Sequence, residues 1–279
     1  MERLEATGSG SGFSVEWLRL RESADAAARA GELVDLLRTR LPSRAPLVIR
    51  DLGCGTGAMG RWLARRLPCP QRWILHDRDP VLLTHASENL PATGMGGEPV
   101  TVETERRDIT QLHADDLADT SLVTASALLD LLTADEVTAL ADACAEHPTL
   151  LALSVEGRVE LTPPDPLDGE IEAAFNAHQR RTAEGRDLLG PDAVDFAAGE
   201  FERRGAVVHR HASPWRLGAA EAPLLAEWLR GWVAAACAHQ PGLTAAAESY
   251  LDRRLAECAD GALRAVIHHG DLLALPAGV

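Results

Sequence analysis

The sequence predicts an α/β protein with a doubly wound, mostly parallel sheet, and three observations carry this prediction. Strand-like and helix-like segments alternate from residue 46 onward, which is the pattern of parallel strands joined by crossover helices. A glycine-rich turn joins the first of these strands to the helix after it, and an acidic residue closes the second strand. Ligands bind at the carboxyl ends of the strands in such sheets, so the turn marks the candidate site.

Each element follows from local patterns. Two leading helices are expected, one starting near Trp17 and one over residues 26–37, because apolar residues recur there at helical spacing. Strands are expected at 47–53, 72–77, 100–107, 120–126 and 149–155, with helices at 58–67, 80–90 and 133–146 between them. A sixth strand is expected at 206–213. Residues 1–13, with their Gly/Ser tract, are not expected to join a core.

Residues 219–260 depart from a minimal doubly wound fold. Two helices, near 221–239 and 244–259, separate the sixth strand from a last strand that begins at Arg264. Trp228 and Trp232 lie at i and i+4, which predicts an amphipathic helix packed on the domain. The insertion is also a candidate lid or dimer contact, so a homodimer is one expected assembly.

Residues 51–57 read Asp-Leu-Gly-Cys-Gly-Thr-Gly. Glycines at 53, 55 and 57 permit turns that a Cβ would forbid and let the backbone approach a ligand, while the helix start behind them offers unpaired N–H groups. Asp51, at the strand tip, suits a cation or an ammonium group better than a pyrophosphate. Asp77 closes the next strand roughly 20 residues further on, where a carboxylate meets a ribose diol.

This motif, followed by an acidic residue at the next strand tip, resembles the class I S-adenosylmethionine-dependent methyltransferases, best over residues 45–157. The resemblance implies a seven-stranded Rossmann-like methyltransferase fold, S-adenosyl-L-methionine as cofactor and S-adenosyl-L-homocysteine as product. It also implies that residues 1–44 lie over the cofactor and that 45–279 form the methyltransferase domain. By matching position, the methionine end of the cofactor would contact Asp51, Gly53, Gly55 and Gly57, and the ribose hydroxyls would contact Asp77. The adenine would meet Asp108 and Ile109, although Asp108 is also explained as a surface-loop residue. The other expected cofactor residues are Cys54, Arg78, and Ala125 and Ser126 where the transferring methyl group would lie.

Other interpretations stay open for some of these residues. Gly53, Gly55 and Ala58 also fit the G-x-G-x-x-(G/A) pattern of NAD-binding proteins, although Asp51 and the third glycine favour the sulfonium cofactor. Cys54 is also explained as a small residue packed in a turn. Trp17 either covers the cofactor or packs its helix on the core, and the second is favoured.

The segment 157–190, after the fifth strand, is predicted to handle the substrate. His178 is the candidate general base, because an imidazole titrates near neutral pH. The remaining candidates are Glu156 and Asn176 as further catalytic groups and Arg158, Gln179 and Arg180 as substrate ligands, since arginine suits a carboxylate or phosphate. A solvated helix face is the alternative for the helical members of this group. Asp130 either faces the active site or begins the next helix.

Charge and composition restrict the partners. A formal net charge of −15 argues against nucleic acid and against an anionic membrane face. The five cysteines and the pair His268 and His269 predict no metal site, because adjacent strand residues point to opposite faces. The N-terminus has no signal-peptide pattern and no run reaches membrane-spanning length, which predicts a cytoplasmic protein.

The acceptor is predicted to be a small molecule carrying a hydroxyl or carboxylate. Residues 126–129 read Ser-Ala-Leu-Leu, where methyltransferases that act on adenine or glutamine amino groups carry an Asn/Asp-Pro-Pro-aromatic tetrapeptide. The alternatives are an RNA or protein methyltransferase and a catalytically silent scaffold that binds S-adenosylmethionine.

Overall fold

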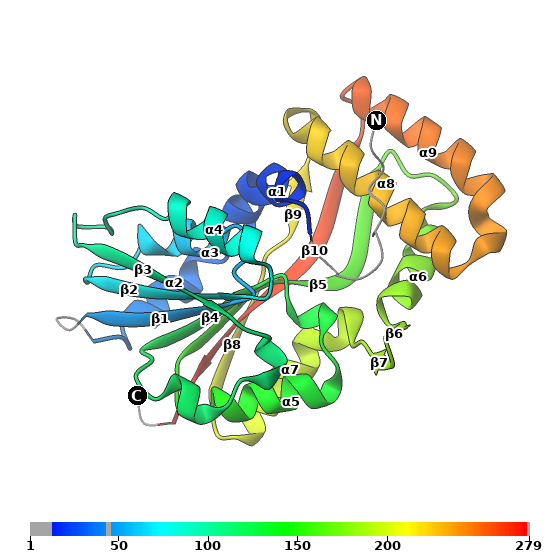
Figure 1. Cartoon of the computed structure of the whole chain (residues 1–279). Helices are drawn as coiled ribbons and strands as arrows, with labels where there is room; N and C mark the ends of the chain where they lie inside the picture. Colours follow the sequence, from blue (N-terminus) through cyan, green and yellow to red (C-terminus); the bar gives the residue numbers. More distant parts are fainter. Residues whose placement is uncertain (1–12, 43–45, 278–279) are drawn as a thin grey trace.

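The computed structural model describes residues 13–42 and 46–277. The chain forms an α/β fold in which helices flank a central β-sheet (Figure 1). The predicted tract at 1–13 lies outside the described residues except for its last position. The strands of the main sheet are β1 (Leu47–Leu52), β2 (Gln71–Asp77), β3 (Val100–Arg106), β4 (Leu122–Ser126), β5 (Thr149–Thr162), β8 (Val207–Ala212), β9 (Trp215–Leu217) and β10 (Arg264–Leu275). Two short strands, β6 (Thr182–Ala183) and β7 (Arg186–Asp187), pair separately.

The strands follow the order β3-β2-β1-β4-β5-β10-β8, and β9 pairs with β10. The pairs among β1 to β5 are parallel, whereas β10 runs antiparallel to β5, β8 and β9. The direction of the strand order therefore reverses between β1 and β4, and a ligand crevice is expected at their carboxyl ends. The predicted doubly wound, mostly parallel fold is confirmed, with β9 added to the seven strands expected.

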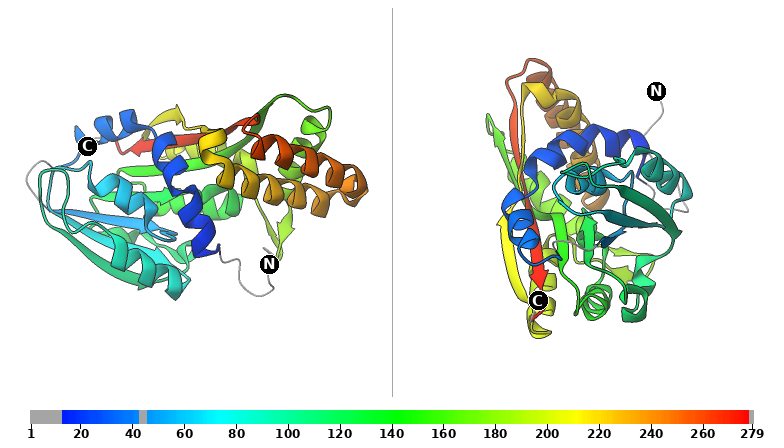
Figure 2. Two further views of the ribbon diagram at one scale, coloured as in Figure 1. Left: turned by 90° about the horizontal axis from the view of Figure 1, so that it is seen from above. Right: turned by 90° about the vertical axis from the view of Figure 1, so that its left-hand side faces the viewer.

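Helices cover both faces of the sheet (Figure 2). One face carries α1 (Val15–Ala28), α2 (Gly31–Arg38), α3 (Ala58–Ala64) and α4 (Pro80–Asn89), and the opposite face carries α5 (Ala134–Ala143) and α7 (Ala193–Arg203). Short 3-10 turns are η1 (Ile109–Gln111), η2 (Ala114–Leu117), η3 (Leu129–Leu131), η4 (Gly190–Asp192), η5 (Ala219–Glu221) and η6 (Pro241–Leu243). Each face has its own buried apolar cluster, so the sheet separates two cores.

A third core lies beyond the sheet proper, where α6 (Asp168–Gln179), α8 (Ala222–His239) and α9 (Thr244–Ala259) pack together. β5 is longer than predicted and extends past the end of β4, which pairs with it only as far as Ala152. β10 pairs with β5 along its whole length. The distal part of this two-stranded ribbon carries the three helices to the side of the strand tips (Figure 1). The helical insertion predicted at 219–260 is present as α8 and α9, and Trp228 and Trp232 stack at 5.0 Å inside that region.

The second leading helix starts later than predicted. α1 continues through Ala28, and the chain turns at Arg29 before α2 begins at Gly31. The Ala30 amide donates a hydrogen bond to Asp271 Oδ2 (2.8 Å) on β10, outside any helix. The break is thus stabilised by a tertiary hydrogen bond, which the local helical spacing of residues 26–37 could not indicate.

Candidate cofactor site

The glycine loop follows β1 directly and adopts the backbone conformation that its sequence requires. Gly53, Gly55 and Gly57 have φ values of +63°, +54° and +83°, in the left-handed region that disfavours side chains with a Cβ. Gly57 is the residue before α3, and a Cβ there would lie 3.1 Å from the Cβ of Ala86 in α4. The loop therefore packs closely against its surroundings, and its backbone precedes the N-terminus of a helix.

The helix α1 lies over this loop. Leu18 Cδ1 is 3.3 Å from the position that a Cβ on Gly55 would occupy. Glu22 binds Arg61 of α3 through both carboxylate oxygens (2.6 and 2.7 Å), and Trp62 Nε1 donates to the Ala26 carbonyl (3.1 Å). These contacts join the leading segment to the helix that begins at the loop. That residues 1–44 cover a bound cofactor stays a prediction, and residues 1–12 and 43–45 lie outside the described chain.

Trp17 packs against the third apolar core, the one formed by α6, α8 and α9. The Arg21 guanidinium lies 6.0 Å from the Trp17 ring and 4.8 Å from the Trp215 ring. These contacts agree with the interpretation that Trp17 packs its helix on the core.

Asp51 is buried with one oxygen unsatisfied. Its Oδ1 accepts a hydrogen bond from Thr124 Oγ1 (2.7 Å), and its Oδ2 has no partner among the described residues. Only 1% of its surface is exposed, and burial raises the pKa of the carboxyl to about 7. A cationic group beside Oδ2 would favour the ionised form and supply the missing contact, which agrees with the predicted preference for an ammonium group.

Asp77 is held by the backbone at the tip of β2. Its Oδ2 accepts from the Gly55 amide (3.0 Å), and its Oδ1 accepts from the Asp79 amide (3.0 Å). A carboxylate has about four acceptor positions. The two amides orient Asp77 and leave acceptor positions for the hydroxyls of a ribose.

Arg29 is a buried cation that the motifs do not reveal. Its Nη2 donates to Ser126 Oγ at the tip of β4 (3.1 Å), while Nε and Nη1 have no hydrogen-bond partner among the described residues. The guanidinium lies 5.6 Å from the Trp62 ring, and burial lowers the pKa of Arg29. Only a tertiary contact identifies Arg29 as a site residue, because its partner Ser126 is 97 positions away in the sequence.

The remaining predicted cofactor residues lie around the same strand ends. Asp108 begins η1 by accepting from Thr110 N (3.0 Å), and it is exposed, as is Arg78. Ile109 and Ser126 are half-buried and Ala125 is buried. Cys54 is buried, its Sγ points to the Gly55 carbonyl (3.6 Å), and burial raises its pKa, so a small residue packed in a turn explains it. Ligand contacts by these residues stay predictions.

The predicted catalytic group lies on α6 and is partly engaged in structural contacts. Asn176 Nδ2 donates to the Gly157 carbonyl (2.7 Å), and Arg180 binds Asp192 through two hydrogen bonds (2.6 and 2.8 Å). His178 is half-buried, and burial, with Arg181 nearby, lowers its pKa. Gln179 keeps a buried Oε1 without a partner among the described residues. The lowered pKa favours the neutral form of the His178 imidazole.

The two candidates on β5, Glu156 and Arg158, are exposed, whereas Asp130 is half-buried. Glu156 lies beside Gly270, and Arg158 pairs with Glu160 (2.7 Å). Asp130 belongs to η3 and does not begin α5, whose N-terminal cap is Thr133. Burial raises the pKa of Asp130, while Arg21 and Arg181 act in the opposite direction. Of the two possibilities for Asp130, the structure therefore excludes the start of the helix.

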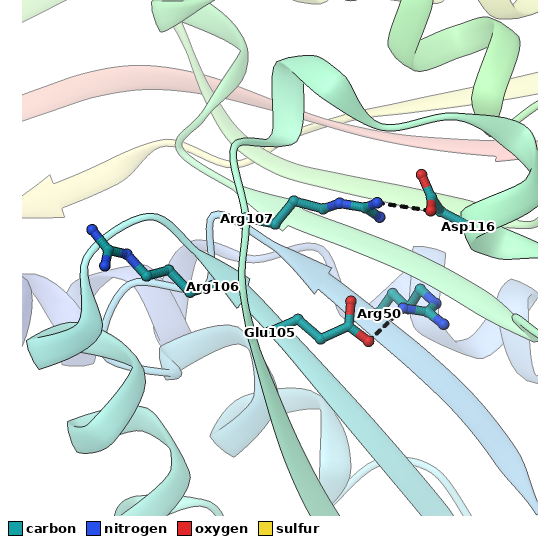
Figure 3. Close-up of a pocket in the computed structure, with 5 residues that line it drawn as sticks. All are labelled: Arg50, Glu105, Arg106, Arg107 and Asp116. Carbon is teal, nitrogen blue, oxygen red and sulfur yellow. Dashed lines mark hydrogen bonds and ion pairs between the residues drawn. The ribbon is translucent and has the colours of Figure 1, made fainter.

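A cavity of about 540 Å³ lies elsewhere, beside β3 (Figure 3). It is lined by Arg50, Glu105, Arg106, Arg107 and Asp116, none of which is a predicted site residue. Arg50 pairs with Glu105 (3.4 Å) and Arg107 with Asp116 (2.8 Å). These pairs neutralise most of the lining charge, and the cavity is separate from the glycine loop.

Two further features concern metals and membranes. His268 pairs with Glu160 (2.8 Å) while His269 is buried 5.2 Å from the Trp215 ring, so the two histidines diverge as predicted. Within residues 13–42 and 46–277, no group of three or more metal-ligating side chains is placed to hold an ion. In the same part of the chain, no helix combines the length and the apolar character needed to span a bilayer.

The family model for a methyltransferase domain matches residues 49–147, which include the glycine loop, Asp77 and the tips of β3 and β4. This match confirms the predicted resemblance to class I S-adenosylmethionine-dependent methyltransferases over that part of the chain. No curated protein sequence matches the chain.

Solved structures with a similar arrangement include the cyclopropane synthase MmaA2 from Mycobacterium tuberculosis, at 14% identity and a TM-score of 0.46, covering 94% of each chain. The YcgJ protein from Bacillus subtilis has 14% identity and a TM-score of 0.47, covering 89% of this chain and 100% of that one. An S-adenosylmethionine-dependent methyltransferase from Geobacter sulfurreducens, in complex with S-adenosyl-L-homocysteine, has 16% identity and a TM-score of 0.45, covering 95% and 99%.

Proposed function

We propose that this chain is an S-adenosylmethionine-dependent methyltransferase that acts on a small-molecule acceptor. The observation that carries the proposal is the set of buried, unsatisfied polar atoms at the glycine loop. Asp51 Oδ2, Thr56 Oγ1 and two nitrogens of Arg29 have no partner among the described residues. Buried polar groups in native proteins are normally paired, so a ligand that supplies both donors and acceptors accounts for all of them.

The residues present fit this cofactor. The positive-φ glycines form a cradle that side chains would fill, Asp51 offers an acceptor to an ammonium group, and Asp77 offers one to a ribose diol. When bound, the cofactor supplies an electrophilic methyl group on a sulfonium. NAD, the competing cofactor, would bring a pyrophosphate to this loop, and the buried carboxylate of Asp51 disfavours that charge.

The acceptor is proposed to bind between the strand tips and the ribbon of β5 and β10. The extension of β5 brings α6 and α8 beside the carboxyl ends of β1 and β4 (Figure 1). Direct displacement requires mainly alignment, for which a shaped pocket can contribute about 7–11 kcal/mol. His178, neutral because burial lowers its pKa, is proposed to accept the proton of a hydroxyl acceptor.

A small acceptor is favoured over a macromolecule by charge. The net charge of −15 opposes binding to a phosphate backbone, and phosphate contacts dominate affinity for nucleic acids. The helices α6, α8 and α9 also lie to the side of the strand tips, where a large substrate would approach (Figure 1).

A silent scaffold would have the same cofactor site but would not transfer the methyl group, so an activity assay distinguishes it from an enzyme.

The test is a transfer assay with S-adenosylmethionine labelled in its methyl group. The protein is incubated with separate pools of hydroxyl compounds, carboxylic acids, total RNA and denatured protein. Label in a small-molecule fraction, identified by product mass, supports the proposal. Label in RNA or protein alone contradicts the acceptor class. Binding of the cofactor without transfer to any pool favours the scaffold.

A further inference from the structure

Two buried side chains of opposite charge carry unsatisfied atoms at the same place in the fold. Asp51 lacks a partner at Oδ2, and Arg29 lacks partners at Nε and Nη1, within the described chain. Their exposed fractions are 1% and 5%. Leaving buried charged groups incompletely hydrogen-bonded is costly, and the cost is removed if a ligand completes both.

The two side chains lie close together because both bind the same strand, and each affects the pKa of the other. Asp51 binds Thr124 and Arg29 binds Ser126, and these two partners are alternate residues of β4. Alternate residues of a strand point to the same face, roughly 6–7 Å apart along it. A carboxylate acceptor and a guanidinium donor therefore lie side by side, under α1 and next to the glycine loop.

The protein's own carboxylates do not satisfy Arg29. Asp25 Oδ2 is 4.0 Å from Arg29 Nη2, beyond hydrogen-bonding distance, and the Asp25 oxygens accept from Arg21 and from Trp215. The oxygens of Asp271 accept from Ala30 N, Leu153 N and Ser213 Oγ (2.6–2.8 Å). The guanidinium thus keeps free donors within the described chain although several acids surround it.

We propose that Arg29 binds the α-carboxylate of the cofactor's methionine moiety while Asp51 binds its ammonium group, so that the site selects a zwitterionic amino-acid head. This inference rests on the proposed function and deepens it. An α-amino acid carries both charges on one carbon, and the adjacent acceptor and donor are complementary to that arrangement. The carboxylate contact comes from the turn between α1 and α2, outside the glycine motif.

The experiment compares two ligands by calorimetric titration. The first is S-adenosyl-L-homocysteine, and the second is its decarboxylated analogue, S-adenosyl-3-thiopropylamine, which keeps the ammonium group and loses only the carboxylate. The wild-type protein should bind the first about 10- to 100-fold more tightly, the range expected for hydrogen bonds to a charged group. The R29M variant should lose this preference while binding the analogue within about threefold of wild type.

A matched control is R66M, because Arg66 also contacts the Trp62 ring (4.4 Å) but is exposed, just past the end of α3. It should keep the wild-type preference. If R29M does not fold, as judged by circular dichroism, R29K retains the charge and should show an intermediate preference.

Two results would overturn the inference without touching the proposed function. One is equal affinity of the wild-type protein for both ligands. The other is an equal loss of affinity for both ligands in R29M or R29K. Failure of the wild-type protein to bind S-adenosyl-L-homocysteine at all would instead refute the proposed function, and the inference with it.

Discussion

The Gly55 amide donates a hydrogen bond to Asp77 Oδ2, 3.0 Å away, and so joins the glycine loop to the tip of β2. The other oxygen of Asp77 accepts from the Asp79 amide at the same distance, 3.0 Å. The two motifs that the sequence places on separate strands thus form one unit. The carboxylate is oriented by backbone amides before a ligand arrives, which reduces the cost of binding.

Asp77→Asn should weaken binding of S-adenosyl-L-homocysteine by about tenfold or more, because an amide replaces an acceptor that meets hydroxyl donors. Calorimetric titration measures this change. The control is Asp79→Ala, which removes the Asp79 side-chain cap of Val81 N and should cost about 1 kcal/mol of stability without changing affinity. Unchanged affinity in the Asp77 variant would remove its assignment to the ribose.

Binding should depend on pH through Asp51. Burial raises the pKa of this carboxyl to about 7, and a ligand ammonium group binds only the ionised form. Affinity should therefore rise as the pH approaches this pKa from below, by about tenfold per pH unit, and then level off above it. Asp51→Asn should bind weakly with no such slope. Titrations at a series of pH values test it, and a flat profile in the wild-type protein would contradict the ammonium contact.

Gly57→Ala should destabilise the protein and weaken cofactor binding. Its φ of +83° disfavours a side chain, and the added Cβ would lie 3.1 Å from Ala86 Cβ and from Leu90 Cδ1. The expected loss is about 1–3 kcal/mol, measured by urea unfolding. Gly231→Ala is the matched control in the interior of α8, where nothing lies within 4 Å, and it should stabilise by up to about 1 kcal/mol. Similar destabilisation by both changes would argue against strain at Gly57.

Once an acceptor is known, His178→Ala should lower turnover by about 10²–10⁴-fold if the acceptor is a hydroxyl. The affinity for S-adenosyl-L-homocysteine should stay the same, because none of the proposed cofactor contacts lies on α6. His239→Ala, a change in a nearby exposed histidine, should leave turnover intact. Wild-type turnover in the His178 variant would return this residue to a solvated helix face.

The glycine loop and the first strands could be predicted because their signals are local. The three glycines at 53, 55 and 57 mark a turn with positive φ angles, which the structure contains. The runs of apolar residues predicted the bounds of the first strands to within a few residues. The break at Ala30 and the extension of β5 depend on contacts with β10, far along the chain. No local pattern encodes such pairings.

The same distinction applies within the site. Asp51 and Asp77 are identified by their place in a motif, whereas Arg29 enters the site through a hydrogen bond to Ser126, 97 positions away. Asn176 and Arg180 are polar residues on and just after one helix, which predicted a substrate surface. In the fold these two side chains bind Gly157 and Asp192. Spacing alone does not separate a polar residue that faces a ligand from one that fixes a helix.

Calorimetric titration of the wild-type protein with S-adenosyl-L-homocysteine and, separately, with NAD tests which cofactor the glycine loop binds. We expect micromolar binding of the first ligand and no binding of the second. Binding of NAD alone would contradict the assignment of the glycine loop to the sulfonium cofactor. Binding of neither would contradict a cofactor role for the loop.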